Sequence, residues 1–172
     1  TVLLCPQCLK EKLKYDNSTL ICIKCKSSFP QESSTFFYDF RTQKFQSEKS
    51  FLIEEELDFH CNSIFQKYVG STCMDKCRSI VKQLEPDIIL DIGCGPGFFA
   101  KNIKGLFFSY FGFEPSNIPI GRGYSESPPE NVFLFHDDIN KKLPIRDQSI
   151  DLVLFMASYD HIEKPETVVR DA

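Results

Sequence analysis

The stretch Leu90–Phe99, "LDIGCGPGFF", decides the fold of this 172-residue chain. The mostly apolar residues from Ile88 to Ile92 predict a buried strand of the kind found in parallel sheets. Three glycines follow at positions 93, 95 and 97, and a helix is expected from about residue 97. Glycine-rich turns between a strand and a helix let backbone N–H groups approach an anionic or nucleotide-like ligand closely. The stretch therefore predicts an α/β fold with a ligand-binding turn.

Acidic residues follow the next two predicted strands. The strand "LFFSYFGFE" ends in Glu114, where a carboxylate can accept hydrogen bonds from both ribose hydroxyls of a nucleoside. A third strand, "NVFLF", leads into "HDDIN", where Asp137 or Asp138 can accept a hydrogen bond from an adenine amino group while Ile139 packs against the ring. A fourth strand is expected from Ile150 to Met156. Acids after successive strands, together with the glycine turn, indicate a nucleoside-containing ligand.

The spacing of the glycines argues against a dinucleotide as the nucleoside-containing ligand. A dinucleotide-binding turn reads GxGxxG, but here the third glycine stands one residue earlier and Phe98 takes its place. Asp91 also suits a ligand with a positive charge better than a pyrophosphate. A nicotinamide site is therefore the weaker interpretation.

Residues 87–172 resemble the class I S-adenosylmethionine-dependent methyltransferases, in particular the small-molecule-type group. "LDIGCGPG" matches the first motif of that family, "FGFEPS" the second, and "DINKKLPIRDQSIDLV" the third and the approach to the fourth. The resemblance implies a Rossmann-like parallel sheet, with S-adenosylmethionine as the cofactor. It assigns the methionine part to Asp91 and the glycine loop, the ribose to Glu114 and the adenine to Asp138 with Ile139. The implied cofactor-binding residues are Asp91, Gly93, Cys94, Gly95, Gly97, Glu114, Pro115, Asp138, Ile139 and Met156.

The chain departs from that family in two places. Pro119 and the stretch "IGRGYSESPP" interrupt the segment that is normally a helix after the second strand. The family also continues through three more strands beyond the position of Ala172, and four strands alone would leave an exposed parallel edge. We therefore expect the chain to be a fragment of a longer enzyme, with the C-terminal strands of the sheet missing.

Four of the eight cysteines have the spacing of a structural zinc site. Each of the pairs "CPQC" and "CIKC" lets two thiolates converge on one ion, and two such pairs complete a closed tetrahedron. Two redox CxxC pairs are the alternative, but they lack the βαβ context that such motifs need. The predicted Zn²⁺ ligands are Cys5, Cys8, Cys22 and Cys25. The other cysteines are interpreted as reduced thiols, which implies a cytoplasmic protein.

Residues 3–30 resemble the zinc ribbons of adaptor subunits that accompany translation-related methyltransferases, and the ribbons that precede many bacterial methyltransferase domains. The resemblance rests on both cysteine pairs, on Leu13 and Tyr15, and on Phe29 and Pro30 after the last cysteine. Lysines outnumber acids in this segment, so it could contact RNA phosphates, although a solvated lysine face on a packing module is the favoured interpretation. The lysines are Lys10, Lys12, Lys14, Lys24 and Lys26, against Glu11 and Asp16.

The pattern of apolar residues divides the chain into three parts. Residues 1–30 form the ribbon, residues 31–70 a linker and a cap helix, and residues 71–172 the incomplete cofactor-binding domain. Helices are expected over Phe51–Tyr68 and Thr72–Leu84, separated at Gly70 and Ser71. These helices would cap the ligand, and His60 or Tyr68 could reach into the pocket.

The charge and hydropathy of the chain limit its partners. The formal net charge of −4 argues against a broad nucleic-acid-binding surface. No run of 18 apolar residues exists, so a membrane-spanning segment is not expected. The chain also lacks the charged-then-apolar layout of a secretory signal at its first residues.

Methyl transfer from a sulfonium depends mainly on alignment and desolvation, because the leaving group is already excellent. If the acceptor needs a base, His161 after the fourth strand is the nearest candidate, with Tyr159 and Asp160 beside it. The leading hypothesis is a methyltransferase for a small molecule or a sugar-linked biosynthetic intermediate. The alternatives are an rRNA or tRNA base methyltransferase, which salt-sensitive RNA binding would favour, and a non-enzymatic cofactor-binding adaptor.

Overall fold

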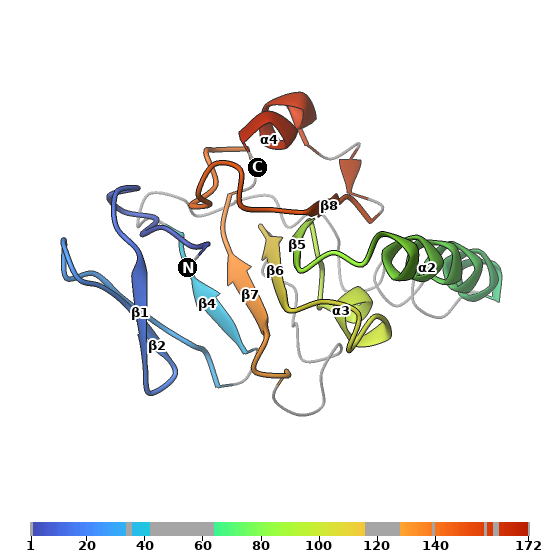
Figure 1. Ribbon diagram of the computed structural model, residues 1–172, viewed down its shortest axis with the longest axis horizontal. Helices are drawn as coiled ribbons and strands as arrows, with labels where there is room; N and C mark the ends of the chain where they lie inside the picture. Colours follow the sequence, from blue (N-terminus) through green and yellow to red (C-terminus); the bar gives the residue numbers. More distant parts are fainter. Residues whose placement is uncertain are drawn as a thin grey trace.

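The computed structural model describes residues 2–33, 36–41, 64–115, 128–138, 140–156, 158–159 and 162–171. They form two sheets (Figure 1). The smaller sheet is antiparallel and contains β1 (Leu13–Asp16), β2 (Thr19–Cys22) and β3 (Ser28–Pro30), in that order. We call residues 2–30, which include this sheet and both cysteine pairs, the ribbon.

The larger sheet has five strands, all parallel, in the order β4-β7-β6-β5-β8. These strands are β4 (Phe37–Asp39), β7 (Val132–His136), β6 (Ser109–Glu114), β5 (Ile88–Ile92) and β8 (Leu152–Leu154). The expected α/β fold with a Rossmann-like parallel sheet is confirmed. Because the strands are parallel, their carboxyl ends meet at one edge of the sheet, and open sheets of this type bind ligands outside that edge.

Strand β4 was not expected, because it lies in residues 31–70, for which the sequence predicts a linker and a cap helix. In the structure, Phe37 is paired with Leu134 of β7, and the ladder continues through a hydrogen bond of 2.9 Å from Phe40 N to His136 O. Successive side chains of a strand point to opposite faces, and here Phe37 and Tyr38 are buried in different apolar clusters. The segment after the ribbon therefore adds a strand to the large sheet.

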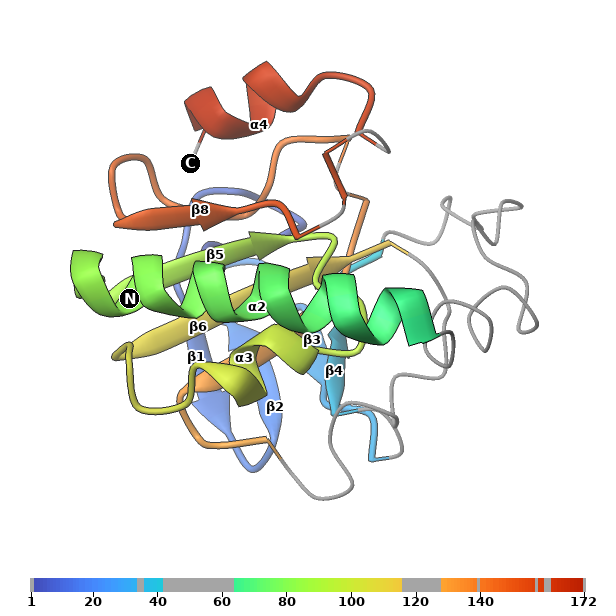
Figure 2. The same ribbon diagram turned by 90° about the vertical axis from the view of Figure 1, so that its right-hand side faces the viewer.

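One face of the large sheet is covered by α2 (Ile64–Leu84) and the short helix α3 (Phe98–Asn102). Figure 2 shows α2 lying along this face, antiparallel to β5. The expected break at residues 70 and 71 is wrong, since α2 is one continuous helix through both positions. The described part of this helix covers a sheet face through Val81, Met74 and Cys77, which differs from the expected cap over the ligand. The rest of the expected first helix, and His60, lie outside the described residues.

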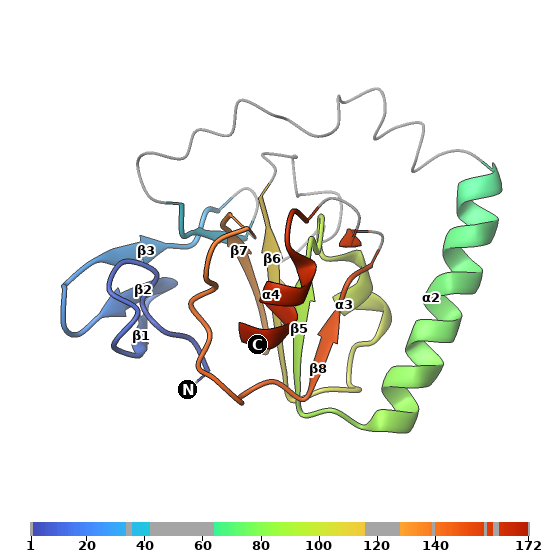
Figure 3. The same cartoon turned by 90° about the horizontal axis from the view of Figure 1, so that it is seen from above.

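The ribbon and α4 (Pro165–Asp171) cover the other face of the sheet. Figure 3 shows the large sheet between the ribbon on one side and α2 on the other. Backbone hydrogen bonds attach the ribbon to the segment before β8: Leu4 N donates to Pro144 O over 2.8 Å, and Arg146 N donates to Val2 O over 3.0 Å. The ribbon is therefore a layer of the same fold.

A chain of phenylalanine rings connects the ribbon to the sheet. Phe29 of β3 contacts Phe40 at a centroid distance of 5.0 Å, and Phe40 contacts Phe135 of β7 at 4.6 Å. Phe135 in turn stacks on Phe113 of β6 at 4.9 Å. Since each aromatic side chain buries a large apolar area, these contacts make the two sheets one hydrophobic core.

No helix within the described ranges is both long enough and apolar enough to cross a membrane.

We predict that Phe40→Ala lowers the free energy of unfolding by about 3–5 kcal/mol, because it opens a cavity between the two sheets. Phe108→Ala is the control, since that side chain is 75% exposed and loses little burial. Urea denaturation of both variants gives the comparison. An equally small loss for the two variants would show that the ribbon and the sheet do not share a core.

Candidate functional site

The three glycines after β5 have three different environments, although all have positive φ: 72° at Gly93, 52° at Gly95 and 76° at Gly97. A Cβ placed on Gly93 would lie 2.4 Å from the Cβ of Ser158, so a packed side chain fills that side of the turn. A Cβ placed on Gly95 would meet no atom of the described residues within 4 Å. Gly97 is the N-cap of α3 in the left-handed conformation. The open side at Gly95 is therefore where a ligand can approach the backbone.

Glu114, at the end of β6, lies directly beside this open position. Its side chain is buried, and its Oε2 accepts a hydrogen bond of 2.8 Å from Gly95 N. The carbonyl of Phe113 accepts further hydrogen bonds from Gly93 N at 2.8 Å and Cys94 N at 3.1 Å. The structure thus brings the predicted ribose-binding carboxylate and the glycine turn together.

Asp91 lies under the turn and is fully buried. The hydroxyl of Tyr110 donates a hydrogen bond to its Oδ2, whereas its Oδ1 has no hydrogen-bond partner among the described residues. Burial, helped by the nearby Glu114 carboxylate, raises the pKa of Asp91 to about 7, although the hydrogen bond from Tyr110 lowers it in part. Tyr110 was not expected at the site, although a tyrosine in a buried apolar strand indicates a hydroxyl that needs a hydrogen-bond partner.

Two acids at the end of β7 have separate environments. Asp137 is fully buried and pairs with Lys141, and its Oδ1 accepts a hydrogen bond of 2.9 Å from Asp138 N. Burial raises the pKa of Asp137 to about 6, and its Oδ2 has no partner in the described part of the chain. Asp138 is more exposed and accepts a hydrogen bond of 2.9 Å from Asn140 N. The assignment of Asp138 to adenine stays a prediction, and Ile139 lies outside the described residues.

Strand β4 adds a charged pair to the same edge of the sheet. Arg41 Nε donates to Asp39 Oδ1 and Arg41 Nη2 donates to Asp39 Oδ2, both at 2.8 Å. The neighbouring His136 is buried, with its Nδ1 3.3 Å from Glu114 O and its ring 4.7 Å from that of Phe37. Burial lowers the pKa of His136, and the charge of Arg41 lowers it further. Sequence reasoning missed this pair, because only the aromatic run around residue 37 indicates a strand there.

The other predicted site residues lie around the turn. Cys94 is buried, and a Cβ placed on Gly112 would lie 2.7 Å from its Sγ, so the thiol packs against β6. Burial raises the pKa of this thiol. Pro115 follows Glu114 directly, and Met156 is half-buried just after β8. His161, the candidate base, lies outside the described residues.

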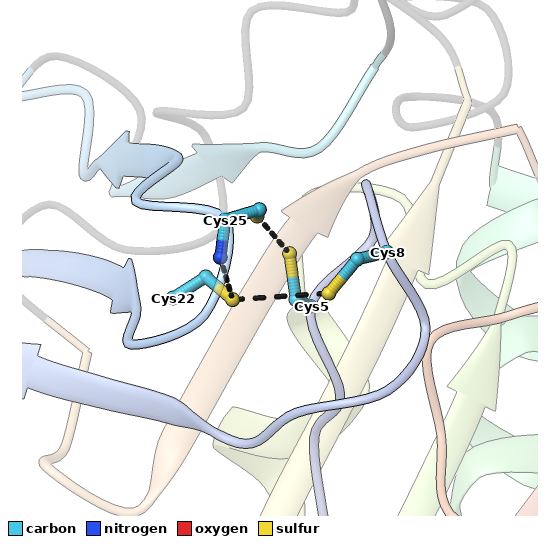
Figure 4. Close-up of side chains that lie close together, drawn as sticks. All are labelled: Cys5, Cys8, Cys22 and Cys25. Atoms are coloured by element: carbon cyan, nitrogen blue, oxygen red, sulfur yellow. Dashed lines mark hydrogen bonds between the residues drawn. The ribbon is translucent and has the colours of Figure 1, made fainter.

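The four predicted metal ligands converge in the ribbon (Figure 4). The Sγ atoms of Cys5, Cys8, Cys22 and Cys25 all lie within 4.8 Å of one another. The Sγ atoms of Cys5 and Cys25 are 3.5 Å apart, and those of Cys8 and Cys22 are 3.8 Å apart. Thiolates bound tetrahedrally at the usual zinc–sulfur length are about 3.8 Å apart. The Ser27 hydroxyl lowers the pKa of Cys25 to about 6, which favours the thiolate that metals bind. These residues fit a Zn²⁺ ion.

Residues 65–172 match the family model described as "Methyltransferase domain", and this match covers more than half of the chain. The chain belongs to the methyltransferase domain family. The match begins within α2, earlier than the resemblance noted from residue 87. The family implies S-adenosylmethionine as the cofactor. The open backbone at Gly95 beside Glu114 fits a cofactor with a ribose, and the Oδ1 of Asp91, which has no partner in the described ranges, fits a positive charge.

Several solved structures are similar to this chain. The YcgJ protein of Bacillus subtilis has 21% identity and a TM-score of 0.49, with 57% of this chain and 43% of that chain covered. The S-adenosylmethionine-dependent methyltransferase of Mesorhizobium loti has 20% identity and a TM-score of 0.44, with 55% and 47% covered. The complex of the Haloferax volcanii Trm112 methyltransferase activator with a putative methyltransferase has 20% identity and a TM-score of 0.42, with 48% and 37% covered. The chain therefore spans less than half the length of each of these structures. No match was found among curated proteins.

We predict that the free energy of unfolding falls as the pH rises from 5 to 8, and that Asp91→Asn weakens this dependence. The pKa of Asp91 is raised to about 7 from an ordinary value of 3.8, so the folded state holds a proton that the unfolded state has released. Its contribution is present below the ordinary pKa and is lost as the pH rises through about 7, with a total on the order of a few kcal/mol. Urea denaturation at both pH values measures the effect. Asp147→Asn, at an exposed position, is the control, and an unchanged dependence in Asp91→Asn would contradict the prediction.

Proposed function

We propose that this chain binds S-adenosylmethionine at the carboxyl edge of its parallel sheet and takes part in methyl transfer to a small molecule or a sugar-linked biosynthetic intermediate. The observation that carries the proposal is the open backbone at Gly95, whose N–H already faces the Glu114 carboxylate. The family match supports the cofactor, and the net charge of −4 supports an acceptor other than a nucleic acid.

Each part of the cofactor has a proposed partner in this arrangement. The Gly93–Gly97 loop and Asp91 would hold the methionine part, and Glu114 would accept hydrogen bonds from the ribose. Asp138 would accept a hydrogen bond from the adenine amino group, with Ile139 against the ring. When bound, the cofactor supplies a methyl group on a positively charged sulfur. The protein then has to align the acceptor and exclude water, with His161 as the proposed base where the acceptor must lose a proton.

The exposed surface of the ribbon favours RNA as a second candidate for the methyl acceptor. All five of its lysines are exposed, whereas Cys5, Cys22 and three apolar residues, Leu13, Leu20 and Phe29, are buried. Such a surface could contact RNA phosphates, and this contact would be sensitive to salt. We favour the small-molecule acceptor because the apolar side of the ribbon is already used to cover the sheet, which gives the ribbon a structural role.

We also propose that the four-cysteine cluster binds one structural Zn²⁺ ion. All four ligand positions would be filled by protein thiolates, so no position is left for a substrate or a water. Cys5 and Cys22 are buried in the same cluster as Phe40 and Phe135. The ion would therefore stabilise the layer that covers one face of the large sheet.

We predict that Gly95→Ala weakens the binding of S-adenosylhomocysteine at least tenfold, because the new Cβ projects into the space where a ligand approaches. Gly105→Ala is the matched control: Gly105 also has a positive φ, of 82°, and within the described part of the chain no atom lies within 4 Å of its Cβ position. Both variants carry the strain of a left-handed alanine, about 1 kcal/mol, but Gly105 lies outside the glycine turn. Isothermal titration calorimetry compares the two variants with the wild type and with Glu114→Ala.

The wild-type titration also tests the alternatives. No binding by the folded wild-type chain would contradict the proposed function and favour a non-enzymatic adaptor. Equal weakening in Gly95→Ala and Gly105→Ala would show that strain, and not the open space, determines the affinity. Salt-sensitive binding of structured RNA by the wild type would favour RNA as the methyl acceptor.

We predict one zinc ion per chain, and its loss in Cys25→Ser. Cys73→Ser is the matched control, because Cys73 is also exposed but lies on α2, outside the cluster. Elemental analysis by mass spectrometry measures the metal content, and thermal unfolding measures the stability. We expect Cys25→Ser to lower the melting temperature and Cys73→Ser to leave it unchanged. Full metal content in Cys25→Ser would exclude a four-thiolate site.

A further inference from the structure

One buried side chain, that of Ser158, connects the segment after β8 to the end of β5. Ser158 is 6% exposed, and its hydroxyl donates a hydrogen bond to the carbonyl of Ile92, the last residue of β5. None of the cofactor contacts proposed above involves Ser158. Its position is nevertheless directly beside the glycine turn.

The side chain of Ser158 fills the space that a side chain on residue 93 would need. A Cβ on Gly93 would lie 2.4 Å from the Cβ of Ser158 and 3.0 Å from its Oγ. Gly93 therefore has a packing reason to be glycine, in addition to its φ of 72°. On this side, the turn is closed to a ligand, whereas at Gly95 it is open.

The peptide between Ile92 and Gly93 is held from both sides. Its carbonyl accepts the hydrogen bond from Ser158, and its N–H donates to Phe113 O over 2.8 Å. The orientation of this peptide sets the path of the backbone that reaches Gly95 two residues later. A change at Ser158 would therefore alter the position of the N–H that faces Glu114.

The residues around Ser158 connect the turn with the surface at the same edge of the sheet. Tyr159 is 58% exposed, and its ring contacts Phe155 at 5.5 Å in an edge-on arrangement. The carbonyl of Tyr159 accepts a hydrogen bond of 3.4 Å from the N–H of Ile162, which is buried in the core. Ser158 thus lies between the turn and an exposed aromatic side chain at the ligand-binding edge.

We infer that Ser158 is a positioning residue, which fixes the glycine turn for cofactor binding and couples that binding to the segment after β8. The inference rests on the proposed function, because it takes the glycine turn as the cofactor site. Ser158 touches the backbone of the turn and acts through it. Cofactor binding should accordingly slow hydrogen exchange in the segment from Phe155 to Ile162.

Titration with S-adenosylhomocysteine tests this inference on the full chain, at a temperature where circular dichroism shows every variant to be folded. Ser158→Ala removes the donor to Ile92 O, and we expect at least tenfold weaker binding. Ser149→Ala is the matched control, since the exposed Ser149 hydroxyl donates to Arg146 O over 2.6 Å, away from the turn. Its affinity should stay within twofold of the wild type. Ser158→Thr keeps the hydroxyl and should bind within threefold of the wild type.

Hydrogen exchange measured by mass spectrometry gives the second readout. In the wild type, S-adenosylhomocysteine should slow exchange in peptides that cover residues 155–162, and in Ser158→Ala this protection should be absent at a saturating concentration. A merely structural role would lower stability without removing the protection. Unchanged affinity and protection in Ser158→Ala, or equal losses in Ser158→Ala and Ser158→Thr, would overturn the inference and leave the proposed function standing. No binding by the wild type would contradict the proposed function itself.

Discussion

The burial of the parallel sheet on both faces is the constraint on which the rest of this structure depends. Ile89, Leu90 and Ile92 of β5 are completely buried, so neither face of this strand meets solvent. On one face, α2 and α3 supply the covering layer, as in other α/β folds. On the other face, the ribbon shares this task with α4. The ribbon is too short to form a hydrophobic core of its own easily, and here it becomes one layer around the core of the large sheet.

The same burial determines the chemistry of the site. Asp91, Glu114 and Asp137 stand at or near the ends of neighbouring strands, and all three are buried. A buried carboxylate without enough donors is costly, which is why the pKa values of Asp91 and Asp137 are raised. Among the described residues, the buried side-chain oxygens without a hydrogen-bond partner belong to Asp91 and Asp137. A ligand that brought hydrogen-bond donors or a positive charge would offset part of this cost, so the acids favour binding at this edge.

The sequence predicted the parts of the fold that depend on local pattern. Strand β5, the glycine turn, and the acid at the end of β6 all lie where the alternation of apolar runs, glycines and acids indicates. The cysteine spacing likewise predicted a cluster that the sulfur positions confirm. These features are encoded within a few consecutive residues, and their periodicity is strong enough to identify them.

The features that the sequence did not predict depend on distant contacts. Strand β4 has three residues, and only its pairing with β7 makes it a strand. Gly70 weakens a helical pattern by about 1 kcal/mol, yet α2 continues through it because its C-terminal half packs on the sheet. The contact of Ser158 with Gly93 joins residues far apart in the chain. Tertiary contacts of this kind cannot be predicted from the local pattern of apolar and polar residues.

A shared core also links the two proposed ligands energetically. A ligand that binds only the folded state stabilises all of the structure that folds with it. Two cysteines of the metal cluster, Cys5 and Cys22, are buried in one apolar cluster with residues of β5, β6 and β7, so a metal bound in the ribbon would stabilise the strands that carry Asp91 and Glu114. The ribbon would thus support the cofactor site without touching the cofactor. Through this link, the proposed closed metal centre would contribute to the function of the methyltransferase domain although it has no position for a substrate.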